Sequence, residues 1–385
     1  MFAHRVANLK EEGAYTMLAR AHALEAQGRR ILHLEVGQPD FDTFDHIKQA
    51  GMRAIQAGRT RYNPSAGLPR LRQAIAEAVS DRIGVPVQPE EVVVGPGAKP
   101  GLFFPTLALV EPGDEVIYPD PGFPTYAAMI EVAGGVPRPV PLLEEKDFSF
   151  DLDAFDACIN ERTRLIVLNT PANPTGGVIP KADLEHIAAA AQKYDAWVIS
   201  DEIYARLAYD GIKVPSIAAL PGMRERTIVV DGFSKTYAMT GWRLGYAIMP
   251  QPLAERVSLL LNHSVGCTAM FTQDAGIEAL TASQALAEEK VAEYQRRRDR
   301  MVAGLNAIPG VTCRLPQGAF YAFPNVKSFG VPSSQLAMRL LEEAGVALLP
   351  GTDFGVHGEG YLRLCYAVSP QEIDEALERM ADVLC

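Results

Sequence analysis

From about residue 90 to residue 250, short apolar runs alternate with turn residues and with Ala-rich or amphipathic segments. The runs are rich in Val, Ile and Leu, as buried strands are, and the Ala-rich segments place apolar residues at helical spacing. This alternation is typical of βα units on a mostly parallel sheet. We therefore predict strands at 92–94, 115–118, 165–168, 197–200 and 227–230, and helices at 103–110 and 181–194.

The two ends of the chain carry a different pattern, with a helical periodicity over residues 1–30 and fewer strand-like runs near the C-terminus. We predict an α/β fold whose large domain, 45–285, is a mostly parallel seven-stranded sheet flanked by helices. Both chain ends, 1–44 together with 286–385, are expected to form a smaller α/β domain. The charged, largely helical segment 253–305 connects the two.

Composition and charge exclude several classes of protein for this chain. With 48% apolar and 22% charged residues over 385 positions, the chain has the make-up of a folded globular protein. A net charge of -11, without any basic run, argues against nucleic acid as a partner. We find no stretch near the ~20 apolar residues that span a bilayer and no apolar leader, so we expect a cytoplasmic protein. The five scattered cysteines form no ligand cluster, so we predict reduced thiols and no metal site.

Polar residues follow four of the predicted strands. Lys99, Asn169, Asp201 and the pair Ser234 and Lys235 all come just after an apolar run. In open sheets of this kind ligands bind beyond the carboxyl ends of the strands. We therefore expect these side chains to meet at one edge of the sheet.

The segment 234–243 suggests an anion site. A lysine at a strand end, such as Lys235, is usually a solvated surface residue. Here Ser234 offers a hydroxyl beside it, and Arg243 offers a guanidinium eight residues further on. The backbone N–H groups of 97–99, where a helix begins, are free to bind the same anion. Together these groups suit a phosphate.

Two further segments are candidate site segments only because they accompany this anion site. Asp201 follows a buried strand and precedes Tyr204, and by itself it would be a helix cap. The Pro-rich loop 169–176 carries the amides of Asn169 and Asn173, and by composition it would be an ordinary turn.

Together these segments resemble the class I/II aminotransferases, which are fold type I enzymes that use pyridoxal 5'-phosphate (PLP). The family's Asn-Pro-Thr-Gly turn matches 173–176, its Ser-Asp-Glu-x-Tyr strand end matches 200–204, and its Ser-Lys before Gly-Trp-Arg matches 234–243. A late arginine matches Arg363 in Tyr-Leu-Arg-Leu. The four motifs occur in order, and the resemblance extends from about residue 37 to 367.

The resemblance implies how the cofactor is held. Lys235 would bind PLP as an imine, and Asp201 would pair with the pyridinium nitrogen and keep the ring cationic, so that it can absorb an electron pair. Asn173 and Tyr204 would donate hydrogen bonds to the phenolic oxygen. Phe123 would stack on the ring, although an ordinary buried phenylalanine is the alternative. Lys235, Asp201 and Tyr204 are thus the expected catalytic residues.

Further contacts follow from the same likeness. Gly97, Ala98, Lys99, Ser234 and Arg243 would surround the phosphate. Tyr62, in the Arg-Tyr-Asn-Pro segment, resembles the tyrosine that reaches the phosphate of the neighbouring subunit. The resemblance therefore implies a homodimer with shared active sites.

The substrate contacts are also inferred from the family. Arg363 would grip the α-carboxylate, with a structural ion pair as the alternative, and Gly37 and Asn173 would lie beside the same carboxylate. Lys99 matches a position that contacts the distal carboxylate in bacterial aspartate aminotransferases. That match favours aspartate or glutamate, with 2-oxoglutarate as the acceptor.

The N-terminal segment leaves the substrate open. Glu12 and Tyr15 stand where those enzymes carry a Ser/Thr pattern, and they would repel an acidic side chain or accept an apolar one. Alanine, branched and aromatic amino acids therefore remain alternatives.

The expected reaction moves an amino group between an L-amino acid and a 2-oxo acid by a ping-pong mechanism. Lys235 would act as general base and then as general acid. A PLP-dependent carbon-sulfur lyase would use the same cofactor residues, so it remains an alternative. A regulatory protein on the same fold would need an added basic DNA-binding region.

Overall fold

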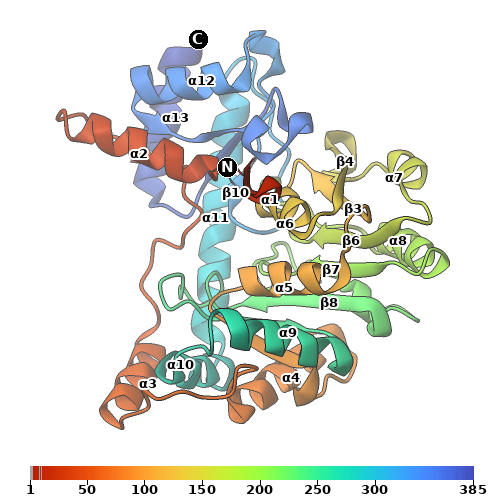
Figure 1. Ribbon diagram of the computed structural model, residues 1–385. Coiled ribbons are helices and arrows are strands. Elements are labelled where there is room, and N and C mark those ends of the chain that lie inside the picture. The colour runs from red at the N-terminus through yellow and green to blue at the C-terminus, as the bar shows by residue number, and fades with distance from the viewer. Residues whose placement is uncertain (1–2, 8, 10) are drawn as a thin grey trace.

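The computed structural model describes every residue except 1, 2, 8 and 10, and it is built around one mixed sheet (Figure 1). The strand order is β2-β9-β8-β7-β6-β3-β4-β5. Neighbours from β8 to β4 are parallel, whereas β9 is antiparallel to β2 and β8, and β5 is antiparallel to β4. The strands are β2 (Val92–Gly95), β3 (Glu115–Asp120), β4 (Val136–Leu143), β5 (Ser149–Phe150), β6 (Thr163–Asn169), β7 (Trp197–Asp201), β8 (Thr227–Gly232) and β9 (Gly245–Ile248).

The α/β class, the mostly parallel sheet and all five predicted strands are confirmed. The sheet has eight strands and not seven, because the two-residue β5 adds an edge beyond β4. The pattern did not reveal β4, whose sequence is Val-Pro-Arg-Pro-Val-Pro-Leu-Leu. Pro137, Pro139 and Pro141 stand at alternate positions of this strand. The backbone nitrogen of each, which carries no hydrogen, therefore faces away from β3. On that side β5 pairs only with Leu142 and Leu143, and the Asp151 N–H donates to the Pro141 carbonyl at 2.9 Å. No N–H is required from the prolines there, and prolines are tolerated at such a sheet edge.

Helices cover both faces of the sheet. On β6, Leu165 and Val167 share a core with α5, α6 and α9, while Ile166 and Leu168 share another with α7 and α8. Because successive side chains point to opposite faces, this apolar run is buried on both sides. The helices are α3 (Asp45–Gln56), α4 (Pro69–Ile83), α5 (Lys99–Leu109), α6 (Thr125–Ala133), α7 (Leu152–Cys158), α8 (Lys181–Lys193), α9 (Gln251–Ser264) and α10 (Met270–Thr281).

Both chain ends contribute to a second core. Met17, Leu34, Leu340 and Ile373 belong to one buried cluster. In this part β1 pairs with β11, and β10-β13-β12 form a three-stranded sheet. The elements are α1 (His4–Ala7), α2 (Gly13–Glu25), β1 (Leu32–His33), β10 (Tyr321–Ala322), α12 (Ser333–Arg339), β11 (Val346–Ala347), β12 (Leu349–Pro350), β13 (Leu362–Cys365) and α13 (Pro370–Leu384).

The long helix α11 (Ala285–Ala307) joins the two parts of the molecule, running from the neighbourhood of α10 at the bottom of the view to α13 at the top (Figure 1). The exact domain limits, 45–285 against both chain ends, stay a prediction, because residues between β7 and β8 also belong to the second core. Among the helices of the described chain, none has the length and apolar content needed to cross a membrane.

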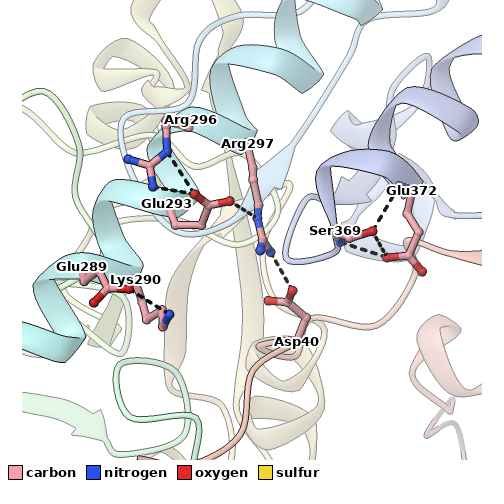
Figure 2. A network of polar contacts seen from close by, with 8 residues as sticks. All are labelled: Asp40, Glu289, Lys290, Glu293, Arg296, Arg297, Ser369 and Glu372. Atoms are coloured by element: carbon pink, nitrogen blue, oxygen red, sulfur yellow. Dashed lines mark hydrogen bonds and ion pairs between the residues drawn. The ribbon is translucent and has the colours of Figure 1, made fainter.

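Ion pairs on α11 fix the segment that follows β1. The Arg297 guanidinium lies between Glu293 on its own helix, at 2.9 Å, and Asp40, at 2.8 Å (Figure 2). Asp40 is three residues beyond Gly37, so this contact ties the N-terminal segment to the helix that joins the two parts. Figure 2 also shows Ser369 and Glu372 in the capping box that begins α13.

A buried charge network lies behind the carboxyl end of β7. From α4, the Arg82 Nη1 atom contacts Glu202 Oε2 at 2.6 Å, and its Nη2 atom is 3.8 Å from Asp231 Oδ2. Glu202 also accepts hydrogen bonds from Ser200, at 2.8 Å, and Ser216, at 2.6 Å. The network therefore holds the residues on both sides of Asp201.

Replacing Arg82 by Met should lower the free energy of unfolding by about 3–5 kcal/mol, because two buried carboxylates lose their cation. The change is measured from urea unfolding curves. Arg70→Met on the exposed side of the same helix is the matched control, with an expected change within about 0.5 kcal/mol. Equal losses in both variants would contradict the assigned role of the network.

Candidate active site

Lys235 lies in the turn after β8 and points to the junction of the two parts of the molecule. Its Nζ donates a hydrogen bond of 2.6 Å to the Gly37 carbonyl. The same atom lies 5.9 Å from the ring centroid of Tyr204 and 5.5 Å from that of Phe320. Burial in this setting lowers the pKa of the Lys235 amine to about 8, although the side chain keeps part of its surface open. The neutral form of this accessible amine is therefore populated at lower pH than that of an ordinary lysine.

Asp201 is the last residue of β7 and is buried. Its Oδ2 accepts a hydrogen bond of 2.8 Å from the Tyr126 hydroxyl, and its Oδ1 accepts one of 3.3 Å from the Ile203 N–H. Burial raises the pKa of the carboxyl to about 6. A cation placed beside it would lower this pKa and keep the carboxylate ionised.

The Pro-rich loop is rigidly attached to the same strand end. Asn169 donates from Nδ2 to the Asp201 carbonyl, at 3.0 Å, and accepts at Oδ1 from the Asn173 N–H, at 2.8 Å. Asn173 Oδ1 in turn accepts a bond of 3.4 Å from the Arg363 Nη1 atom. Asn169 and Asn173 thus link the end of β7 at Asp201 to Arg363.

Tyr204 contacts a second tyrosine that was not predicted as a site residue. Its hydroxyl is 2.8 Å from that of Tyr321, 117 residues away, and either can be the donor. Burial raises the pKa of Tyr321 to about 12 and that of Tyr204 well above its ordinary value, so both stay protonated near neutral pH. Tyr321 also lies so close to Gly37 that a Cβ atom there would collide with its hydroxyl.

Arg363, on β13, is buried and carries unused hydrogen-bonding capacity. Its guanidinium donates to the Glu35 carbonyl and lies against the rings of Tyr321, at 4.6 Å, and Phe354, at 5.0 Å. Its Nε is buried and has no partner among the described residues. A buried donor left unpaired is costly, and the planar fork of an arginine suits a carboxylate. These contacts favour a bound carboxylate over a structural ion pair.

The segments expected to surround a phosphate bring Gly97 and Arg243 together. Gly97 has a φ of 89°, and a Cβ atom there would strike the Arg243 guanidinium, so these two residues are in close contact. Arg243, with a φ of 53°, donates to the carbonyls of Thr240 and Pro96. The Gly97 N–H, however, donates to the Gly95 carbonyl at 2.8 Å, so it is not the free donor that we expected. In the first turn of α5, which begins at Lys99, Pro100 has no N–H and the Gly101 N–H donates to the Ala98 carbonyl at 2.9 Å. The N–H groups left for an anion at this point are those of Ala98 and Lys99.

The other residues predicted to contact the cofactor or the substrate range from buried to fully exposed. Ser234 is buried directly before Lys235. Phe123 is half-buried and meets Tyr126 edge-on, with 5.8 Å between ring centroids. The Lys99 ammonium lies 5.3 Å from the Phe123 ring centroid, but it is paired with the Glu12 carboxylate. Tyr62 is 97% exposed, as a residue that serves a neighbouring subunit would be.

A cleft of about 650 Å³ opens beside these residues. Its walls come from α2, from the start of α6 and from the segment 350–356 of the second core. Phe123 and Phe354 line it, so it adjoins both Lys99 and Arg363.

Comparison with known proteins assigns the family. The family model described as aminotransferase class I and II matches residues 29–380. The chain is 42% identical to an aspartate aminotransferase of Pyrococcus abyssi, covering 92% of each chain, and 39% identical to aromatic-amino-acid aminotransferase 2 of Thermococcus litoralis, covering 93% of each. The solved structure of Thermus thermophilus aspartate aminotransferase with maleate superposes with a TM-score of 0.95, at 40% identity and full coverage of both chains.

These matches define a PLP-dependent transferase of fold type I. The chain belongs to the class I and II aminotransferase family.

The lowered pKa of Lys235 sets the pH at which the apoprotein reacts with PLP, because only the neutral amine attacks an aldehyde. The rate of yellow colour formation should rise up to about pH 8 and then level off. Stopped-flow absorbance measures this rate, with Nα-acetyl-lysine as the control, whose rate keeps rising towards its ordinary pKa of about 10.4. A protein rate that still climbs in parallel with the control above pH 9 would contradict the burial argument.

Proposed function

We propose that this enzyme moves an amino group between an L-amino acid and a 2-oxo acid by a ping-pong mechanism, with PLP held on Lys235. The proposal rests above all on Lys235, a largely enclosed but accessible amine with a pKa lowered to about 8, which lies where the two parts of the chain meet. An anion cradle and a buried guanidinium lie near it.

The residues present fit the cofactor. Asp201 would hold the pyridinium nitrogen, since Tyr126 already fixes its orientation. Tyr204 and Asn173 would donate to the phenolic oxygen, and Phe123 offers a half-exposed ring face for stacking. Ser234, Arg243 and the first turn of α5, with Ala98 and Lys99, would hold the phosphate. When bound, the cofactor supplies an electron sink for the pair left by a departing Cα proton.

The chain's own side chains would orient the substrate and move its proton. Arg363 and Asn173 bind the α-carboxylate, which would give the unpaired Nε an acceptor. Because Gly37 has no side chain, the Tyr321 hydroxyl can lie against its backbone, next to the place proposed for that carboxylate. The Lys235 amine takes the proton from the substrate Cα and later returns one, and a pKa of about 8 suits both duties near neutral pH.

The identity of the substrates is the finer part of the proposal. Lys99 would attract the side-chain carboxylate of an acidic donor, with 2-oxoglutarate as the acceptor. Glu12 would repel that carboxylate and so favours an uncharged donor. The relatives' names cover aspartate and aromatic amino acids, so the family alone does not decide. Because Lys99 is already paired with Glu12, we propose that the preferred donor has an uncharged side chain.

We also propose a homodimer with shared active sites. Tyr62 lies almost wholly in solvent, so it is available to reach the phosphate held by a second copy.

Replacing Lys235 by Ala tests the function. The purified wild-type protein should show a band at roughly 360–430 nm, and the variant should lose it on dialysis, because it has no amine to hold the cofactor. Transamination should fall at least about a hundredfold. Lys193→Ala, which removes an exposed lysine of α8, should change neither.

A wild-type protein without the band, or a Lys235→Ala variant with full activity, would refute the proposal. Release of pyruvate and ammonia from a cysteine conjugate, without any 2-oxo acid acceptor, would identify a lyase instead.

A further inference from the structure

An ion pair inside the chain occupies the lysine that an acidic substrate would need. The Glu12 carboxylate contacts the Lys99 ammonium across 87 residues of sequence. The Thr125 hydroxyl, at the start of α6, is 3.5 Å from the same carboxylate oxygen. Glu12 is thus held between the first residues of two helices of the large sheet.

This pair lies just behind residues that line the cleft, although neither Glu12 nor Lys99 lines it. Glu11 and Gly13, on either side of Glu12, line the cleft, and so does Phe123, whose ring centroid is 5.3 Å from Lys99 Nζ. A substrate side chain that extends past Phe123 into the cleft therefore approaches Lys99 together with its partner.

Local structure explains why Glu12 reaches Lys99. Glu12 immediately precedes α2, yet its side chain makes no capping bond to that helix. Lys99 is the first residue of α5, where a cation faces the positive end of the helix dipole. A carboxylate beside it offsets that repulsion, so the chain supplies its own anion at this point.

The rest of the cleft adds little attraction for a second anion. Its other charged side chains are the carboxylates of Glu11, Glu131 and Asp353, against the single guanidinium of Arg20. Much of the described lining is apolar and includes Met17, Phe123, Ala127, Ala128 and Met338. The cleft is thus suited to an uncharged side chain.

We propose that Glu12 is a specificity-determining residue that occupies Lys99 and selects amino acids with uncharged side chains over acidic ones. An acidic substrate has to displace Glu12 and leave it without its cation, whereas an uncharged side chain leaves the pair intact. The inference rests on the proposed aminotransferase function and concerns the side-chain end of that same site.

Glu12→Gln keeps the shape of the side chain and removes its charge. We expect the ratio of kcat/KM for aspartate to that for phenylalanine to rise about twofold to fivefold in this variant, the range suited to a partly exposed ion pair. Glu11→Gln is the matched control, because it removes the same charge from the adjacent position, where no ion pair to Lys99 occurs among the described residues. This control should change the ratio less than twofold.

A double variant tests whether the effect passes through Lys99. In a Lys99→Gln background, Glu12→Gln should no longer raise the ratio, because no cation is left to release. An unchanged ratio in Glu12→Gln, an equal effect in Glu11→Gln, or an undiminished effect without Lys99 would each overturn the proposal.

Calorimetry on the holoenzyme gives a readout that needs no turnover. The Kd of maleate, a dicarboxylate, should tighten in Glu12→Gln by about the same factor, while the Kd of 4-methylpentanoate should not. If wild-type enzyme transaminates neither aspartate nor phenylalanine, nor any other amino acid, the proposed function fails. If it transaminates amino acids but the ratio and the maleate Kd stay the same, only the role of Glu12 fails.

Discussion

The removal of one lysine amine from water is the constraint on which this structure depends. Lys235 Nζ is surrounded by two aromatic rings and a backbone carbonyl, and its pKa falls because the charged form loses hydration there. The three groups come from distant segments: Gly37 near the N-terminus, Tyr204 after β7, and Phe320 near the C-terminus. Groups from both parts of the molecule therefore surround the amine and contribute to the burial that lowers its pKa.

Charged residues hold that contact in place at some distance from the amine. Arg297 ties the segment after Gly37 to α11, and Arg82 fixes the residues that flank Asp201. Arg363 completes the arrangement with a guanidinium that is only partly satisfied by protein. Buried charge of this kind is a poor source of stability, and its presence is better explained by the ligand it orients.

Local patterns in the sequence predicted the parts of the structure that depend on neighbours in the chain. The apolar runs located five strands, and the motifs around Asn173, Asp201 and Lys235 located the edge where the site forms. β4 escaped because alternating prolines hide its strand pattern. Tyr126 and Tyr321 gave no local signal, since each acts through a hydroxyl on a residue 75 or 117 positions away. Glu12 stood out as a departure from the family pattern, but its pairing with Lys99 needed the fold.

The most direct test of the account is to find the atom that carries the cofactor. Borohydride reduction of the holoenzyme fixes the imine permanently, and peptide mass spectrometry then locates the modified lysine. The account predicts one pyridoxyl group, attached to the peptide that contains Lys235. A group attached to any other lysine, with Lys235 unmodified, would contradict it.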